Sequence, residues 1–552
     1  MIITELQQLY AAHPNVEGMY RLLQDNSVRH LYCSGLCASA ASLFSSVLIQ
    51  RVECPFVFIL GDLEEAGYFY HDLTQILGTE QVLFFPSSFR RAIKYGQKDA
   101  ANEILRTEVL SRLQKGEEGL CVVTYPDALA EKVVSRKELG DKTLKLHLGE
   151  KVDMDFVTEV LRSYSFEYVD YVYEPGQYAV RGSIIDVFSF SSEFPFRIDF
   201  FGDEVESIRT FEVESQLSKE KKENIVIVPD LSHSLEQRGN GGMVSFLDFL
   251  QPDTLLAMKD FLWLRERIQT VHDEALTAQA IAAREAEENG LISLDGKLID
   301  GGEFTLRALD FRRIEFGTKP TGTPDATVTF NTTAQPIFHK NFDLVAESFH
   351  DYLSRNYALY ICSDSLKQTE RIRAIFEDRG DNISFTSVER TLHEGFADDA
   401  LRLCIFTDHQ LFDRFHKYNL KSDKARSGKV ALSLKELNQF TPGDYVVHTD
   451  HGVGRFTGLV RIPNGDTTQE VMRLVYQNDD VVFVSIHSLH KVSKYKGKEG
   501  EAPRLNKLGT GAWEKLKDRT KTKIKDIARD LIKLYSQRRE EKGFQYSPDS
   551  FL

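Results

Sequence analysis

Cysteine is scarce in this sequence, and long apolar runs are absent. Six cysteines are spread over 552 residues with no CxxC pair, a pattern that indicates neither a disulfide framework nor a zinc site. No apolar run reaches the roughly 18–20 residues that a membrane-spanning helix needs. The N-terminus, MIITELQQLYAAHPN, lacks the basic segment and apolar core of a secretory signal. We therefore expect a cytoplasmic protein with no membrane partner and no bound metal.

The motifs of nucleotide hydrolysis are also absent. A phosphate-binding loop needs two glycines followed by Lys and a hydroxyl residue, because backbone N–H groups cradle the phosphates and the Lys contacts them. Behind the first apolar run the chain reads SGLCASAAS, which has Gly35 but no second glycine and no Lys. No DExD/H box, HExxH or GxSxG motif follows. We therefore expect no catalytic residues and no cofactor in this chain.

Positive charge is in deficit overall but concentrated near the end of the sequence. The formal net charge is −15, which argues against nucleic acid wrapping the whole surface. Residues 511–542, in contrast, hold eleven Lys or Arg against six Asp or Glu. Apolar residues from Trp513 to Leu534 recur there at helical spacing. Two interpretations stay open: the solvated face of a linking helix, or a lever that contacts double-stranded DNA.

Strand and helix patterns divide the chain into several folding units, as its length suggests. Residues 28–130 alternate short apolar strands with helices, the rhythm of a parallel α/β sheet, and residues 350–412 return to it. Residues 150–215 predict an antiparallel meander. Residues 441–496 hold four strand-like runs, about the length of one small barrel. The predicted fold class is multidomain α/β and α+β, with a small Tudor-like β-barrel and a long C-terminal helix.

The run PFRIDFF of the meander precedes a predicted hairpin turn at Gly202-Asp203. Because side chains alternate along a strand, one of its faces is wholly apolar and should be core: Phe196, Ile198 and Phe200. The other face carries Arg197 and Asp199 and should be wet, which leaves Phe201 exposed among charges. Exposed aromatic residues beside arginine are typical interface anchors. The alternative is an edge Phe that a loop partly covers.

The run EVMRLVYQN is the third strand of the predicted barrel. Alternation puts Met472, Leu474 and Tyr476 on one face of it, and Arg473 on the other between two valines. One face must form the core of so small a barrel, and the other still carries apolar groups. A sheet edge here could accept a strand from a partner.

Two stretches carry a specific resemblance. EPGQYAVRGSIIDVFSF, followed by PFRIDFFGDEVESIRTFEVESQLS, resembles the segment shared by the excision-repair protein UvrB and the Mfd family of transcription-repair coupling factors. HTDHGVGRFTGLV, with VYQNDDVVFVSIHSLHKVSKY, resembles the RNA-polymerase-interaction domain that the Mfd family shares with CarD-type regulators. Only the Mfd family carries both. SGLCASAAS resembles its first module, which lacks the nucleotide-binding residues that UvrB keeps.

The resemblance implies roles for particular residues. The family positions that bind UvrA match Arg181, Arg197 and Phe201. Those that bind the β subunit of RNA polymerase match Met472, Arg473 and Leu474, with Met472 at the sensitive apolar position. The family continues into a double-stranded-DNA translocase motor that uses ATP and Mg and is missing here. We therefore expect an N-terminal fragment without ATPase activity.

The implied function is the coupling of transcription to nucleotide-excision repair, in which the chain binds a stalled polymerase and recruits UvrA to the lesion. Two alternatives stay open, a UvrB-type excision-repair helicase subunit and a CarD-type polymerase-binding regulator. The expected domains are, in order, a degenerate UvrB-like α/β domain (1–130), an inserted UvrA-binding α+β domain (131–217), the second part of the UvrB-like domain (218–335), an α/β spacer domain (336–420), a linker (421–440), the polymerase-interaction barrel (441–500) and a linker helix (501–552).

Overall fold

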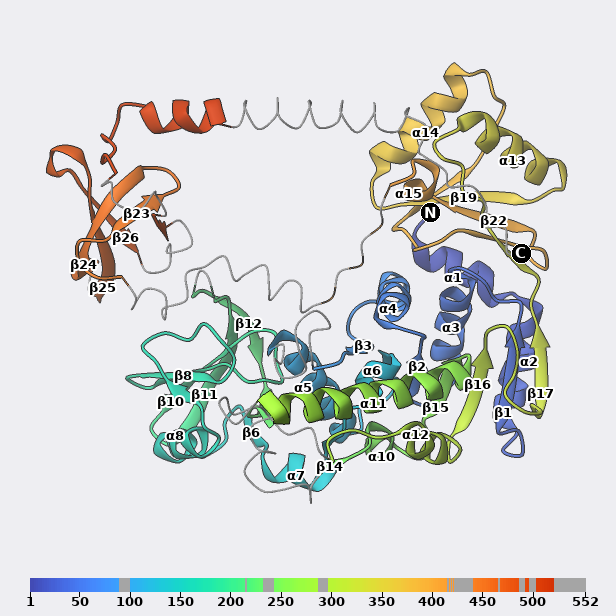
Figure 1. The fold of residues 1–552 in the computed structure, drawn as a ribbon, viewed down its shortest axis with the longest axis horizontal. Coiled ribbons are helices and arrows are strands. Elements are labelled where there is room, and N and C mark those ends of the chain that lie inside the picture. The colour runs from blue at the N-terminus through green and yellow to red at the C-terminus, as the bar shows by residue number, and fades with distance from the viewer. Residues whose placement is uncertain are drawn as a thin grey trace, which may run out of the picture. The chain divides into compact units, whose positions relative to one another are not determined.

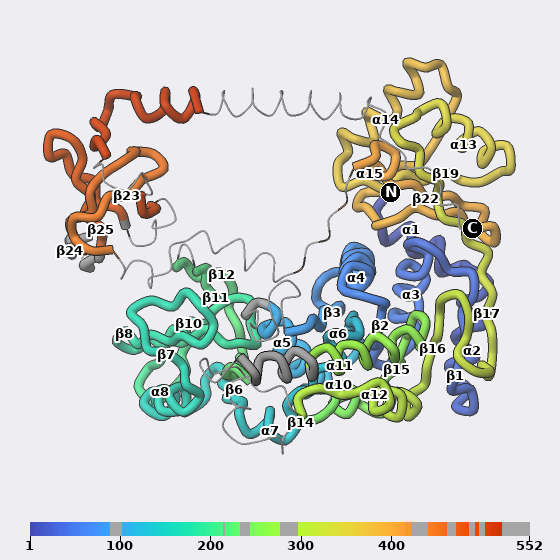
Figure 2. The backbone as a smooth tube through the Cα atoms, in the orientation of Figure 1, coloured from blue at the N-terminus to red at the C-terminus, as the bar shows by residue number. Residues whose placement is uncertain are grey.

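A computed structural model gives the fold of most of the chain (Figures 1 and 2). It describes residues 1–88, 100–213, 216–231, 243–285, 296–414, 416, 418, 420, 440–464, 467–485, 492–495 and 503–520. The chain forms two compact units, Met1–Phe211 with Ser218–Arg426 and Glu212–Leu217 with Ser427–Leu552. No helix in the described ranges combines the length and the apolar character that crossing a bilayer requires.

The first unit begins with a seven-stranded parallel sheet in the order β17-β1-β16-β15-β2-β4-β3. Its strands are β1 (His30–Ser34), β2 (Phe56–Ile59), β3 (Val82–Phe85), β4 (Cys121–Thr124), β15 (Leu255–Lys259), β16 (Arg312–Phe316) and β17 (Ala326–Thr329). Runs such as FVFI, VLFF and CVVT are buried throughout, because helices cover both faces of a parallel sheet. The predicted parallel rhythm of residues 28–130 is confirmed.

Helices surround this sheet. They are α1 (Ile3–Ala11), α2 (Pro14–Gln24), α3 (Ala40–Arg51), α4 (Leu63–Leu77), α5 (Ala100–Lys115), α6 (Pro126–Leu129), α7 (Arg136–Asp141), α10 (Phe246–Phe249), α11 (Phe261–Glu285) and α12 (Gly301–Ala308). The start of α4 shows how the sequence fixes such an element: the Asp62 carboxylate accepts the Glu65 N–H at 2.9 Å, an N-cap that satisfies a free donor of the first turn. Gly78, with φ 84°, ends the same helix.

The second sheet is mostly antiparallel. In the sequence, its strands follow β4 and precede β15 of the first sheet. Its order is β12-β11-β10-β9-β8-β7, with β7 (Glu167–Tyr168), β8 (Gln177–Arg181), β9 (Ile184–Val187), β10 (Phe196–Phe201), β11 (Glu204–Phe211) and β12 (Ser218–Lys222). Helix α8 (Met154–Ser163) shares one buried apolar cluster with it. The predicted two-residue turn is confirmed, because Phe201 pairs with Glu204 and Gly202 has φ 63°. Two short antiparallel pairs adjoin, β6 (Leu144–His147) with β13 (Asn224–Ile227) and β5 (Val133–Val134) with β14 (Met243–Val244).

The third sheet completes the first unit. Its order is β18-β21-β22-β19-β20, with β18 (Thr332–Ala334), β19 (Ala358–Ser363), β20 (Thr386–Glu389), β21 (Phe396–Asp398) and β22 (Leu403–Thr407), and with helices α13 (Phe342–Ser354), α14 (Leu366–Asp378) and α15 (Asp408–Leu411). Strands β20, β19 and β22 run parallel. Helix α1 lies beside this sheet (Figure 2), where Ile2 bridges to Glu389 and the Tyr10 hydroxyl donates to Asp398 at 2.7 Å. The first and third sheets therefore pack as one body.

The second unit holds a five-stranded antiparallel sheet in the order β26-β25-β24-β23-β27. Its strands are β23 (Tyr445–His448), β24 (Gly452–Asn464), β25 (Thr467–Val475), β26 (Val481–Ser485) and β27 (Val492–Lys494), with a 3-10 turn η3 (Gln477–Asp479). Closure into a Tudor-like barrel stays a prediction. Residues 512–520 are helical. The rest of the predicted long helix, and with it most of the basic segment 511–542, lies outside the described residues.

Candidate docking surfaces

One face of the second sheet carries two arginines around a single buried carboxylate. Asp186 on β9 pairs across the sheet with Arg197 on one side and with Ala179 on the other, so its side chain shares a face with both arginines. Arg197 donates to it through Nε and Nη2, each at 2.8 Å. Arg181 donates to the same carboxylate through Nη2. This geometry is the two-point recognition that arginine and carboxylate groups form.

The two guanidinium groups are held in place but are still accessible. The Asp186 side chain is fully buried, whereas those of Arg181 and Arg197 are 38% and 15% exposed. The Arg197 guanidinium also lies over the Phe211 ring at 4.5 Å, and that of Arg181 lies over Tyr171 at 5.1 Å. An arginine with this many contacts loses little rotamer entropy when a partner binds. The pair therefore forms a pre-organised basic surface.

Phe201 projects from the same face at the end of β10. Its side chain is 77% exposed, whereas Phe196, Ile198 and Phe200 are 7%, 0% and 3% exposed. The predicted assignment of core and exposed faces for PFRIDFF is thus confirmed. The bulge between Asp199 and Phe200 leaves the alternation of β10 intact. An exposed aromatic ring therefore stands at the end of the strand that carries Arg197.

Asp186 was not among the residues predicted from the sequence. The available signal was a single acidic residue inside the apolar run SIIDVFSF. No other residue of this run is charged, so the strand itself offers Asp186 no ion-pair partner. Its partners come from the neighbouring strands, so only the register of the sheet identifies them. A second, looser pair on this face joins Arg209 to Asp199 at 3.9 Å.

The expected polymerase-binding strand is more deeply buried than the sequence analysis predicted. Met472 and Leu474 on β25 are both 0% exposed. Met472 and Leu474 therefore belong to the core of this sheet, and their role in polymerase binding stays a prediction. The opposite face is also covered, since Val471 and Val475 are 2% and 6% exposed. Only Arg473 of the three predicted residues keeps partial exposure.

The edge of this sheet also differs from the prediction. Strand β25 is internal because it pairs with β24 on one side and β26 on the other. In the described part of the unit, β26 ends the sheet and carries Phe483, which is 50% exposed and pairs directly with Arg473. An outer strand with an exposed aromatic ring is the element here that a partner strand could extend.

The turn after β1 stands where a phosphate loop would be, and its backbone N–H groups are hydrogen-bonded to other parts of the protein. The Cys37 N–H donates to Thr332 Oγ1 at 3.0 Å, and the Ser39 N–H donates to the Glu394 carbonyl at 3.3 Å. At Gly35, which has φ 78°, a Cβ would lie 1.9 Å from the Phe330 carbonyl oxygen. Backbone donors of the kind that cradle phosphates in a P-loop are thus already hydrogen-bonded to protein acceptors.

Two parts of the chain match known protein families. Residues 144–233, which include Arg181, Arg197 and Phe201, match the UvrB interaction domain. Residues 440–496 match the CarD-like/TRCF RID domain. The chain thus carries one domain of each of these two families.

Curated relatives match nearly the whole chain. It is 25% identical over 588 residues to the transcription-repair-coupling factor of Bacillus subtilis (strain 168), and 25% identical over 597 residues to that of Staphylococcus aureus (strain bovine RF122 / ET3-1). Each match covers 94% of this chain and 49% of the relative, so the chain spans about half the length of these proteins. The resemblance to the transcription-repair-coupling factors is confirmed.

Proposed function

We propose that this chain couples transcription to nucleotide-excision repair by binding RNA polymerase through one domain and UvrA through another. The observation that carries the proposal is the presence of a UvrB interaction domain and a CarD-like/TRCF RID domain in one chain. Neither a UvrB-type subunit nor a CarD-type regulator accounts for both. The ATP-driven translocation along double-stranded DNA belongs, in this proposal, to the half of the relatives that the chain does not match.

The UvrA-binding surface is the polar face of the second sheet. Its anchors are Arg181 and Arg197, held by Asp186, and the exposed ring of Phe201. Arginine and aromatic side chains dominate the energetics of most protein interfaces. Fixed guanidinium groups would pair with carboxylates of UvrA, and Phe201 would fill an apolar pocket.

The polymerase-binding surface is the β26 side of the sheet in the second unit. Arg473 and Phe483 form its accessible centre. Met472 and Leu474 support it from the core, so they act on the polymerase β subunit indirectly, through the shape of the sheet. Contact with double-stranded DNA through the basic segment 511–542 stays a prediction.

This chain itself should hydrolyse no ATP. The closed turn at Gly35 supports this proposal, because the N–H groups of Cys37 and Ser39 already donate to Thr332 and to Glu394. Saturable ATP turnover by the purified chain would contradict it.

Pull-down of purified UvrA and of the polymerase β subunit by this chain tests the coupling function. Coupling predicts that both bind. Retention of UvrA alone favours a UvrB-type subunit, and retention of the β subunit alone favours a CarD-type regulator.

A further inference from the structure

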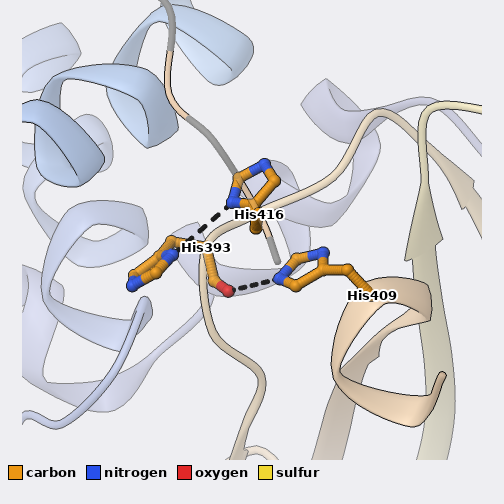
Figure 3. A group of neighbouring side chains, drawn as sticks. All are labelled: His393, His409 and His416. Carbon is orange, nitrogen blue, oxygen red and sulfur yellow. Dashed lines mark hydrogen bonds between the residues drawn. The ribbon is translucent and has the colours of Figure 1, made fainter. Parts of the chain in front are cut away.

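Four of the 15 histidines of the chain meet in one place in the first unit. His71 lies on α4, His393 follows β20, His409 lies on α15 and His416 lies on the segment after it (Figure 3). The ring centroids of His409 and His416 are 4.2 Å apart, and those of His71 and His416 are 4.8 Å apart. Segments distant in sequence therefore bring several imidazole groups together.

The cluster lies at a position in the fold where ligands commonly bind. Strands β19, β20 and β22 run parallel, and His393 and His409 both follow the carboxyl ends of such strands, at Glu389 and Thr407. In open α/β sheets, ligands bind outside the carboxyl ends of the strands. From the sequence, this domain was expected to act only as a spacer and to bind no metal.

The ring nitrogens have spacings close to those of a metal site. One nitrogen from each of His393, His409 and His416 lies within 4.8 Å of the other two. The Nδ1 atoms of His393 and His416 point toward each other and are 3.5 Å apart (Figure 3). Tetrahedral zinc with Zn–N bonds of about 2.0–2.1 Å places its ligand nitrogens about 3.3 Å apart. The first pair already has this spacing, and a rotation of the His409 ring would bring in the third.

Carboxylates stand behind two of the three rings. His409 Nδ1 is 3.8 Å from Asp408 Oδ1, and His393 Nε2 is 3.6 Å from Glu394 Oε1. Metal-binding histidines usually donate their second ring N–H to a carboxylate or carbonyl group, which fixes the tautomer. His409 Nε2 here donates to the His393 carbonyl at 2.7 Å. An ion bound at Nε2 would replace this proton, and Nδ1 would then carry the proton beside Asp408.

A metal ion binds neutral imidazole through the one ring nitrogen that keeps a lone pair. His71, against the His416 ring, has a buried Nε2 with no hydrogen-bond partner in the described part of the chain. A fourth ring of the cluster thus also offers a buried nitrogen.

We propose that His393, His409 and His416 form a binding site for a divalent transition-metal ion, with Zn²⁺ as the expected ion. Neutral imidazole suits zinc, and carboxylates in the second shell are common in its sites. The bound ion would fix the segment that carries His416 to the carboxyl edge of the third sheet. This role is independent of UvrA and polymerase binding.

Titration with Co²⁺ tests the site. The chain is prepared without a histidine tag, stripped with a chelator and titrated with Co²⁺. We expect saturation at one equivalent, with the visible absorption of four-coordinate Co²⁺, and displacement by an equal amount of Zn²⁺. Absence of saturable binding at one equivalent would overturn the proposal.

Variants locate the binding. His393→Asn with His416→Asn should abolish the absorption, whereas His350→Asn, which changes an exposed histidine on α13 of the same domain, should keep it. Glu394→Gln should weaken binding about 10–100-fold, because it replaces the second-shell carboxylate by a neutral amide. This variant keeps all three ligands, so it also tests the site if the double variant fails to fold. Equal Co²⁺ binding by the wild-type chain and the folded double variant, or by the wild-type chain and Glu394→Gln, would contradict the assignment.

Discussion

Arg197 binds the buried Asp186 carboxylate through two parallel hydrogen bonds, each of 2.8 Å. Arg181 binds the same carboxylate from the adjacent strand. Because one acidic group serves two guanidinium groups, the trio keeps a net positive charge at the surface of the sheet. The arrangement links a core residue to the proposed docking surface, because the buried Asp186 sets the direction of both arginines.

Asp186→Asn should weaken UvrA binding without changing a contact residue. We expect about a tenfold higher dissociation constant, because each arginine must then be ordered during binding at a cost of about 0.5–1.5 kcal/mol. Stability should fall by about 1–3 kcal/mol, since a buried acceptor loses its charge. Calorimetric titration with UvrA and urea denaturation measure the two effects.

Asp199→Asn is the matched control. Asp199 lies on the same face, but its ion pair with Arg209 is long, at 3.9 Å, and partly exposed. Such a pair contributes about 0–1 kcal/mol, so both measurements should stay near the wild-type values. Wild-type UvrA affinity in Asp186→Asn would show that arginine orientation does not matter.

Phe201→Ala should weaken UvrA binding by about 2 kcal/mol, or roughly 30-fold, as expected for an aromatic anchor. The melting temperature should not change, because the ring is 77% exposed. Phe156→Ala is the control, since Phe156 is a 52% exposed aromatic on α8 of the same domain. Equal losses of affinity in the two variants would indicate a nonspecific effect.

Strand alternation was enough to predict the exposure of Phe201, because one face of PFRIDFF is wholly apolar. The same reasoning failed at EVMRLVYQN. Alternation shows which side chains share a face, but both faces of β25 are covered, as the burial of Met472 and Val471 shows. In so small a sheet, chain segments outside the strand decide what is exposed, and the strand sequence does not contain them.

Met472→Arg should unfold the sheet of the second unit. It places a charge at a fully buried position, a change that costs several kcal/mol. Phe483→Ala should instead keep the sheet folded and weaken binding to the polymerase β subunit. Circular dichroism and a pull-down with the β subunit separate the two results. A folded Met472→Arg chain, or a Phe483→Ala chain with full binding, would show that the surface is misplaced.

Acid should weaken the contact between α1 and the third sheet. Burial raises the pKa of the Asp398 carboxyl, but the His13 ring, with its Nε2 3.4 Å away, and the hydrogen bond from Tyr10 outweigh burial and hold that pKa below its usual value. A carboxyl with a lowered folded pKa stabilises the fold above its unfolded pKa, and this contribution is lost as the pH falls through the folded value.

Asp398→Asn should therefore lower the free energy of unfolding at pH 7 by about 1–3 kcal/mol, and by less near pH 3. Urea denaturation at both pH values measures this difference. Asp310→Asn, at an exposed position of the same unit, should have no effect at either pH. If Asp398→Asn lowered the free energy of unfolding equally at both pH values, the result would contradict the claim that Asp398 is ionised in the folded chain.

The histidine cluster shows a further limit of prediction from sequence. The spacing of His393, His409 and His416 matches no metal motif, because these residues follow the ends of two different strands of the third sheet. Much of the parallel sheets was predictable, since strands such as β2, β3, β4 and β22 are short runs buried on both faces. Long-range contacts such as Tyr10 with Asp398 became visible only once the sheets were placed.

The most direct test of the coupling function is a ternary complex of this chain with UvrA and the polymerase β subunit. Size-exclusion chromatography with light scattering of the three purified proteins should give one species with the summed mass. Phe201→Ala should release only UvrA, and Phe483→Ala only the β subunit. Failure of the wild-type chain to hold both proteins at once would contradict the proposed coupling.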